Sequence, residues 1–231
     1  MDDAILIEKS EGILTLSINN PPRNGLSRAV LQRFLEIEPS FHEPDVDVII
    51  VTGHGRHFSA GADIDEMPNI PNKDVMEDYA AQAGALFELL ARSNKPLIAA
   101  INGTCLGGGL ELALCCHFRV AGDKAMMGLP EIELGLIPGL GGTQRLPRLI
   151  GETRAMDMIL FGKTVRGQQA LDIGLVHRIA PRKEVMEVAR KLAGELQKRH
   201  QDAVRKAVRS VRAASQMPVS AGLELERGFF V

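Results

Sequence analysis

Two glutamates lie in sequence surroundings that could adapt a carboxylate to acid or base chemistry. Glu111 follows three consecutive glycines at the expected start of a helix, and Glu131 follows Pro130 twenty residues later. Because Glu131 is embedded in apolar and glycine-rich sequence, partial desolvation would raise its pKa and leave it able to carry a proton. Each glutamate also has a simpler interpretation. Glu111 could satisfy free amides at the helix start, worth about 0.3 to 1 kcal/mol, and Glu131 could be a solvated turn acid.

Two glycine-rich segments offer main-chain amides as hydrogen-bond donors. The first, His57 to Asp63, follows an expected buried strand, and its small residues let a ligand approach the backbone closely. The second, Gly103 to Gly109, leads into a helix that begins near Leu110. Free amides at a helix start attract negative charge. The two loops could converge on one oxygen atom, although glycines of this kind could also serve only as tight turns.

Several common catalytic and binding motifs are missing. The second glycine-rich segment has neither the GxGxxG spacing of a dinucleotide fold nor the GK[ST] ending of a P-loop, which disfavours nicotinamide and nucleotide chemistry. No GxSxG or HExxH is present, and His54 and His57 share a loop without further ligands, so we expect no metal. An odd number of cysteines predicts reduced core thiols at Cys105, Cys115 and Cys116.

The elements that must position these groups alternate between strands and helices. Ile5 to Ile7 and Ile13 to Ile18 predict a hairpin. Further strands are expected at Val46 to Thr52, Leu97 to Ile101 and Phe118 to Ala121, and helices from Ser27 to Pro39, Asp74 to Ser93, Gly107 to Cys116 and Thr143 to Leu149. This pattern predicts an α/β core over residues 1–150.

The region after Gly151 is expected to be mainly helical. Helices are predicted at Arg154 to Phe161, Gly167 to Ile173 and Lys183 to Arg199, interrupted only by a short strand at Val176 to Ile179. No internal repeat is present. A boundary near residue 150 would therefore separate layers of structure, with residues 151–231 as a C-terminal helical region, more than independent domains.

Bulk composition excludes some classes of partner. The chain has 231 residues, with 27 basic and 29 acidic side chains, so its charge of -2 gives no general attraction to nucleic acid or membranes. No apolar run reaches the roughly 18 to 20 residues that span a bilayer, and the N-terminus lacks a signal-peptide pattern, so we expect a cytoplasmic protein. Residues 182–212 carry ten Lys or Arg, but acidic residues are interspersed and stacking aromatics are missing, which favours a solvated helical face.

Four motifs together resemble those of the crotonase, or enoyl-CoA hydratase/isomerase, superfamily. They are FSAGADI at residues 58–64, GGGLELA at 107–113, PEI at 130–132 and IPGLGGTQRL at 137–146. The similarity runs in order from the hairpin to residues 170–176. It implies a crotonase-like spiral of ββα units. It also implies that the C-terminal helices cover the acyl site and form a homotrimer or a dimer of trimers, although this region is shorter than usual.

The resemblance further implies a reaction. In the family, amides at the positions of Ala62 and Gly108 hold a thioester carbonyl oxygen, and one such donor can be worth about 2.7 to 4 kcal/mol. Hydratases grip one water with two glutamates, and this chain has both, as Glu111 and Glu131. The expected reaction is reversible syn addition of water to a trans-2-enoyl-CoA, giving a 3-hydroxyacyl-CoA. Glu111 would deprotonate the water that attacks C3, while Glu131 would deliver a proton to C2. Coenzyme A enters as part of the substrate, with no bound cofactor.

The same resemblance implies a wider binding site and leaves alternatives open. Arg23 would be a candidate for the phosphates. His117 stands where most relatives have an acidic residue, and it could be a core histidine or a pH-sensitive group near the site. An enoyl isomerase, a thioester hydrolase or an inactive binding subunit remain alternatives. The residues implied to contact coenzyme A or the acyl chain are Arg23, Gly25, Ala60, Ala62, Asp63, Ile64, Leu106, Gly107, Pro130, Pro138 and Gly139.

Overall fold

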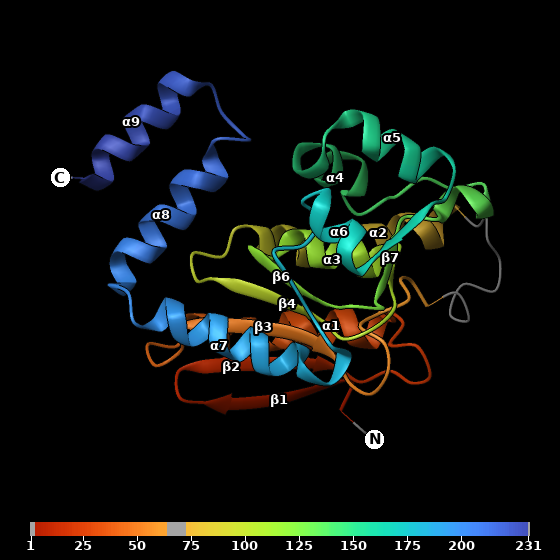
Figure 1. The fold of residues 1–231 in the computed structure, drawn as a ribbon, viewed down its shortest axis with the longest axis horizontal. Coiled ribbons are helices and arrows are strands. Elements are labelled where there is room, and N and C mark those ends of the chain that lie inside the picture. Colours follow the sequence, from red (N-terminus) through yellow and green to blue (C-terminus); the bar gives the residue numbers. More distant parts are fainter. Residues whose placement is uncertain (1–2, 64–72, 231) are drawn as a thin grey trace.

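A six-stranded sheet forms the centre of the molecule (Figure 1). The structure is a computed structural model and describes residues 3–63 and 73–230. The first strand pairs antiparallel with the second, and all other neighbours in the sheet are parallel. In spatial order the strands are β1 (Ile5–Ser10), β2 (Ile13–Ile18), β3 (Val48–Gly53), β4 (Leu97–Ile101), β6 (Phe118–Gly122) and β9 (Arg178–Ala180).

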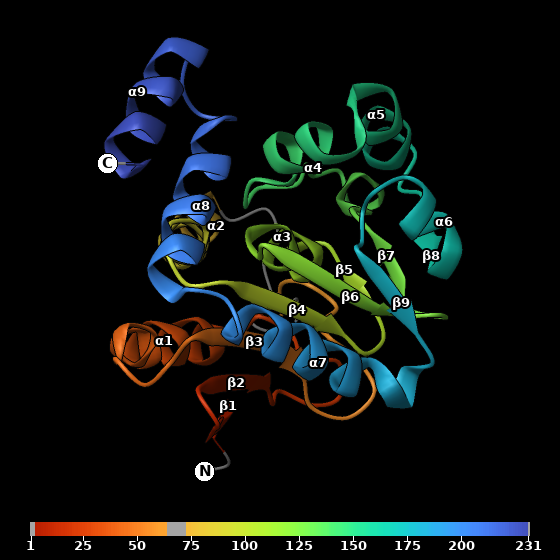
Figure 2. The same cartoon turned by 60° about the vertical axis from the view of Figure 1, so that its left-hand side comes forward.

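Helices cover both faces of this sheet (Figure 2). Because side chains alternate along a strand, Ile49 and Val51 face the large core formed with α1 (Arg28–Ile37), α2 (Lys73–Ala91) and α3 (Gly108–Cys115). Val48 and Ile50 face the opposite way and pack against α7 (Val185–Gln197). Burial on both faces explains why these parallel strands are continuous apolar runs in the sequence.

A second, three-stranded sheet was not predicted. It consists of β5 (Cys105–Leu106), β7 (Met126–Gly128) and β8 (Thr164–Arg166), with β7 in the middle. The expectation that Gly103 to Gly109 is entirely loop is therefore wrong, because its central residues pair with β7. The amide of Gly107 continues this ladder by donating to the carbonyl oxygen of Gly128 at 3.0 Å. This small sheet fixes the point at which α3 begins.

The C-terminal region contributes to the core before it leaves the body of the molecule. Strand β9 pairs with β6, and α7 packs on the main sheet, whereas α8 (Gln201–Ala213) and α9 (Val219–Phe230) extend outward (Figures 1 and 2). No residue of α9 is buried. The remaining helices are α4 (Gly142–Ile150), α5 (Glu152–Leu160) and α6 (Gly167–Asp172), with 3-10 helices at Glu38–His42, Glu131–Leu134 and Arg182–Glu184.

The predicted α/β core followed by helices is confirmed, and the cysteines are placed in the core as expected. All three thiols are buried and free of disulfides, with Cys105 in β5 and Cys115 and Cys116 at the end of α3. Among the described residues, no helix is both long and apolar enough to cross a bilayer.

Candidate active site

A cavity of about 230 Å³ lies where the start of α3 meets two other segments, residues 58–63 and residues 130–140. Of the residues predicted for the site, nine line this cavity: Ala60, Ala62, Leu106, Gly107, Gly108, Glu111, Pro130, Glu131 and Gly139. Residues that are remote in sequence, including both glutamates and both predicted amide donors, therefore surround one space.

The main-chain amides of Ala62 and Gly108, both in the cavity wall, have no acceptor among the described residues. Gly108 is the first residue of α3, so its amide is one of the donors that a helix leaves unpaired. The segment carrying Ala62 is fixed by the amide of Leu26, which donates to the carbonyl oxygen of Gly61 at 2.8 Å. The two amides approach each other closely, since a Cβ on Gly108 would lie 3.6 Å from the nitrogen of Ala62.

Two glycines keep the space in front of these amides open. Gly61 has a φ of 100°, and a Cβ there would lie 3.2 Å from the nitrogen of Gly108. Gly107 caps α3 with a φ of 52°, and a Cβ there would lie 3.3 Å from Oε1 of Glu131. A side chain at either position would be strained and would crowd the amide of Gly108 or the carboxyl group of Glu131.

Glu111 is held in a fixed orientation by main-chain donors. Its side chain is 1% exposed, and Oε1 accepts hydrogen bonds from the amides of Leu140 at 2.8 Å and Gly142 at 2.7 Å. Burial raises the pKa of this carboxyl group, while the two amides and the charge of Arg145 oppose that rise. The carboxyl group is thus buried yet supplied with donors that stabilise its ionised form.

Glu131 has the more strongly perturbed carboxyl group of the pair. Burial, reinforced by the charge of Glu111, raises its pKa to about 7. Its Oε2 is buried and has no hydrogen-bond partner among the described residues. The residue begins a 3-10 helix, Glu131–Leu134, instead of lying in a solvated turn. A carboxyl group of this kind holds or releases a proton near neutral pH, which suits a general acid.

The other predicted contacts lie outside this cavity or outside the described residues. Arg23 is exposed, and its carbonyl oxygen accepts the amide of Ala60 at 3.1 Å. Gly25 lies against the carboxylate of Asp63, and Asn20 bridges the two. Pro138 is buried beside Gly142. The cavity is therefore not lined by Arg23, Gly25, Asp63 or Pro138. Ile64 lies outside the residues that the structure describes.

Sequence reasoning missed several residues of the cavity wall. Tyr79 is the chain's only tyrosine, and it lines the cavity from α2 while its hydroxyl donates to the carbonyl oxygen of Leu26 at 2.8 Å. The lone tyrosine in an otherwise apolar helical face was the only available signal. The remaining wall residues not predicted are Gly61, Ala80, Leu134, Leu136, Ile137 and Leu140.

His117 lies away from this cavity and behaves as a structural histidine. Its Nδ1 accepts the amide of Leu97 at 2.9 Å, and burial lowers its pKa to about 3. The ring is therefore neutral near neutral pH, which favours the first of the two interpretations considered for it. Among the described residues, no group of three or more His, Cys, Asp or Glu side chains is arranged to hold a metal ion.

Comparisons with known proteins identify the family. The sequence pattern of the enoyl-CoA hydratase/isomerase family matches residues 8–231. A 2,3-dehydroadipyl-CoA hydratase from Escherichia coli is 39% identical over 98% of this chain and 88% of that protein. A probable enoyl-CoA hydratase from Bacillus subtilis is 42% identical over 84% of this chain and 76% of that protein.

Solved structures of similar proteins support the same family assignment. An enoyl-CoA hydratase from Bacillus anthracis superposes with a TM-score of 0.94 and 35% identity, covering 98% of this chain and 89% of that one. A second structure, of Pseudomonas aeruginosa DspI, gives a TM-score of 0.95 with 35% identity, over 100% of this chain and 89% of that one. The chain belongs to the enoyl-CoA hydratase/isomerase family, and both the resemblance and the crotonase fold predicted from the motifs are confirmed.

Proposed function

We propose that this protein is an acyl-CoA hydratase that adds water reversibly, in the syn sense, to a trans-2-enoyl-CoA and forms a 3-hydroxyacyl-CoA. One observation carries the proposal: two carboxyl groups with different environments share a cavity with two unpaired amides. The names of the E. coli and B. subtilis relatives support hydration as the reaction.

In the proposed mechanism, the amides of Ala62 and Gly108 bind the thioester carbonyl oxygen. Their hydrogen bonds withdraw electron density, so C3 of the conjugated double bond becomes electrophilic and the enolate-like charge that develops on oxygen is stabilised. Because both donors belong to a fixed backbone, they need no rearrangement as that charge develops.

The two carboxyl groups transfer the protons that the addition of water requires. Glu111, whose ionised form the amides of Leu140 and Gly142 stabilise, orients a water and accepts its proton as oxygen bonds to C3. Glu131, whose pKa is about 7, donates its proton to C2. The proton accepted by Glu111 then returns to Glu131 before the next turnover, so that the protons balance. Addition of both components from the same side of the double bond gives the syn product. Dehydration reverses each step, and the two groups titrate as a coupled pair.

The reaction type is tested by following crotonyl-CoA with three simultaneous readouts. Hydration predicts loss of the conjugated-thioester absorbance, no release of free thiol, and formation of 3-hydroxybutyryl-CoA. Released thiol would indicate a hydrolase. A substrate with its double bond at C3 that is converted to the conjugated isomer, with no water added to crotonyl-CoA, would indicate an isomerase. A screen of straight, branched and aromatic enoyl thioesters then defines the acyl group.

We also propose that the C-terminal helices mediate assembly into a trimer or a dimer of trimers. Support comes from α9, which has no buried residue and exposes Val219, Leu223 and Phe230. Apolar side chains gathered on a projecting helix are typical of an interface. Light scattering of the purified protein should give three or six times the mass of one chain, and a monomer would contradict this proposal.

A further inference from the structure

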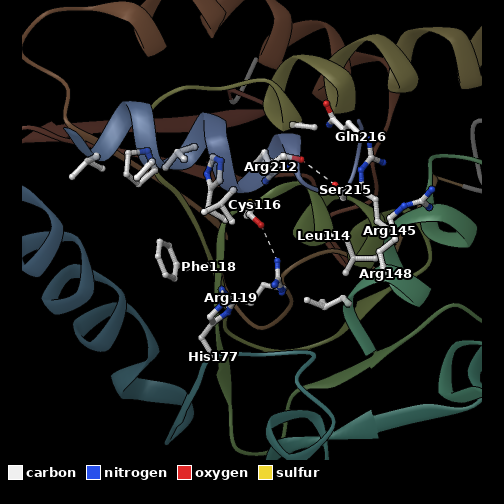
Figure 3. Close-up of a pocket in the computed structure, with 18 of the residues that line it drawn as sticks. Leu114, Cys116, Phe118, Arg119, Arg145, Arg148, His177, Arg212, Ser215 and Gln216 are labelled. Atoms are coloured by element: carbon white, nitrogen blue, oxygen red, sulfur yellow. Dashed lines mark hydrogen bonds between the residues drawn. The ribbon is translucent and has the colours of Figure 1, made fainter. Parts of the chain in front are cut away.

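A second and larger cavity lies away from the candidate active site, between α8 and the body of the molecule (Figure 3). Its volume is about 690 Å³, within the range of small-molecule sites. Its walls include residues of α2, α3, α4, β6, α7 and α8, and neither proposed catalytic glutamate lines it. The cavity is separate from the candidate active site, although Arg145 in its wall also acts on the charge of Glu111.

Four guanidinium groups line this cavity: Arg119 from β6, Arg145 and Arg148 from α4, and Arg212 from α8 (Figure 3). None of them forms an ion pair with a carboxylate of the described residues. Glu88 is the one acidic residue in the wall, and it pairs with Arg92 instead. Arg145 also acts on the charge of the buried Glu111. Among the described residues, the cavity therefore holds three positive charges, on Arg119, Arg148 and Arg212, without a matched negative charge.

These arginines are held in place by neutral acceptors. Arg119 is 3% exposed and donates to the carbonyl oxygens of Leu175 at 2.8 Å and Cys116 at 2.8 Å. Arg212 donates to the carbonyl oxygen of Cys115. Main-chain carbonyls at the end of α3 orient these groups but do not neutralise them, and a buried cation without a counter-charge is costly.

The neighbouring groups add donors and no compensating charge. Burial and the nearby arginines lower the pKa of His117 to about 3 and that of His177 to about 4. Nδ1 of His117 accepts a main-chain amide, so the neutral ring carries its proton on Nε2, for which the part of the chain that the structure describes offers no acceptor. Burial lowers the pKa of Arg119 to about 10, which leaves it charged at neutral pH.

The rest of the wall is largely apolar. Leu114, Phe118 and Leu149 line it from the body of the molecule, and Val204, Val208 and Val211 line it from α8. Val208 and Val211 are three residues apart, so they lie on one face of that helix. A ligand that fits these walls must combine a charged, oxygen-bearing head with an apolar chain.

We propose that this cavity binds an anionic amphiphile, specifically a medium-chain carboxylate, with its head among the arginines and its chain against the apolar face of α8. Guanidinium groups donate paired hydrogen bonds to the two oxygens of a planar carboxylate. A neutral amide or alcohol accepts such a pair less well. The inference does not depend on which reaction the active site performs.

Calorimetric titration with octanoate tests the proposal, with octanamide as the uncharged ligand of equal length. Arg148→Gln removes a guanidinium at an exposed position, where its partners are only the backbone and side chain of Gln144. We expect octanoate to bind the wild type with one site per chain, and to bind this variant roughly tenfold more weakly. Octanamide should bind the wild type no more tightly than octanoate binds Arg148→Gln.

Two further variants make the test specific. Val211→Asp, at a 74% exposed position of the wall, places a competing carboxylate near the arginines and should also weaken binding. Arg205→Gln, on the same helix but outside the cavity, should bind octanoate like the wild type. Equal affinity in the wild type, Arg148→Gln and Val211→Asp would overturn the proposal. Failure of octanoate to bind the wild type, as when a second copy of the chain fills the cavity, would overturn it as well.

Discussion

Replacing Glu131 by glutamine should stabilise the folded protein at alkaline pH while abolishing its activity. The carboxyl group has a pKa of about 7 in the folded state, raised from the ordinary value of 4.5 by burial and by Glu111. Below pH 4.5 it is protonated in both folded and unfolded chains and contributes nothing to pH dependence. As pH rises from 4.5 to 7, the unfolded chain releases the proton first, so the folded state progressively loses stability.

The size of this effect follows from the pKa change. A rise from 4.5 to about 7 corresponds to at most roughly 3 kcal/mol. Because Glu131 is partly exposed, solvent screening reduces the expected penalty to about 1 to 2 kcal/mol. Above pH 7, the free energy of unfolding of Glu131→Gln, measured in urea, should therefore exceed that of the wild type. Near pH 4.5 the two free energies should be nearly equal.

Urea unfolding across this pH range tests this prediction, with Glu133→Gln as the control. Glu133 is an exposed carboxylate in the same 3-10 helix, so its substitution removes an equal charge without relieving burial. A stability difference between wild type and Glu131→Gln that does not change with pH would refute the assignment of a buried, proton-holding carboxyl group at this position.

Three other predictions concern the site. Gly61→Ala places a methyl group 3.2 Å from the nitrogen of Gly108 at a φ of 100°, and kcat should fall roughly 100- to 1,000-fold through loss of an oxyanion donor; steady-state turnover within a few fold of wild type would contradict this geometry. The hydration rate at saturating substrate should decline as pH rises through about 7, because Glu131 then loses the proton that it donates; a rate that instead increases through this range would assign that proton to another group. Tyr79→Phe removes the hydrogen bond to the carbonyl oxygen of Leu26 and should lower the free energy of unfolding by about 1 kcal/mol, measured by thermal denaturation; unchanged stability would mean that water replaces the lost donor.

Most of the main sheet could be predicted because its strands other than β9 have five or six residues each, long enough to show a pattern. Val48–Gly53 and Leu97–Ile101 are continuous apolar runs, as strands buried on both faces must be. Strands β5, β7 and β8 have only two or three residues each, too few to show any periodicity. Their pairing depends on contacts between segments that are remote in sequence, and the sequence alone carries little sign of it.

The candidate site could be predicted in part for a similar reason. Glu111 and Glu131 stand out because acidic residues are unusual among glycines and apolar residues. The amides of Leu140 and Gly142 that hold Glu111 have no such signature, since every residue except proline has an amide. Tyr79 comes from a helix remote in sequence, and only the fold brings it to the cavity.

The most direct test of the proposed mechanism is the turnover of crotonyl-CoA by Glu111→Gln and Glu131→Gln, measured beside the affinity of each variant for a saturated acyl-CoA. Both side chains line one cavity with the amides of Ala62 and Gly108. We predict that each variant loses at least roughly 100-fold in hydration rate, while thioester binding stays close to that of the wild type. Near-normal turnover in either variant would show that its carboxyl group does not handle the water's proton, and the two-carboxylate mechanism would be wrong.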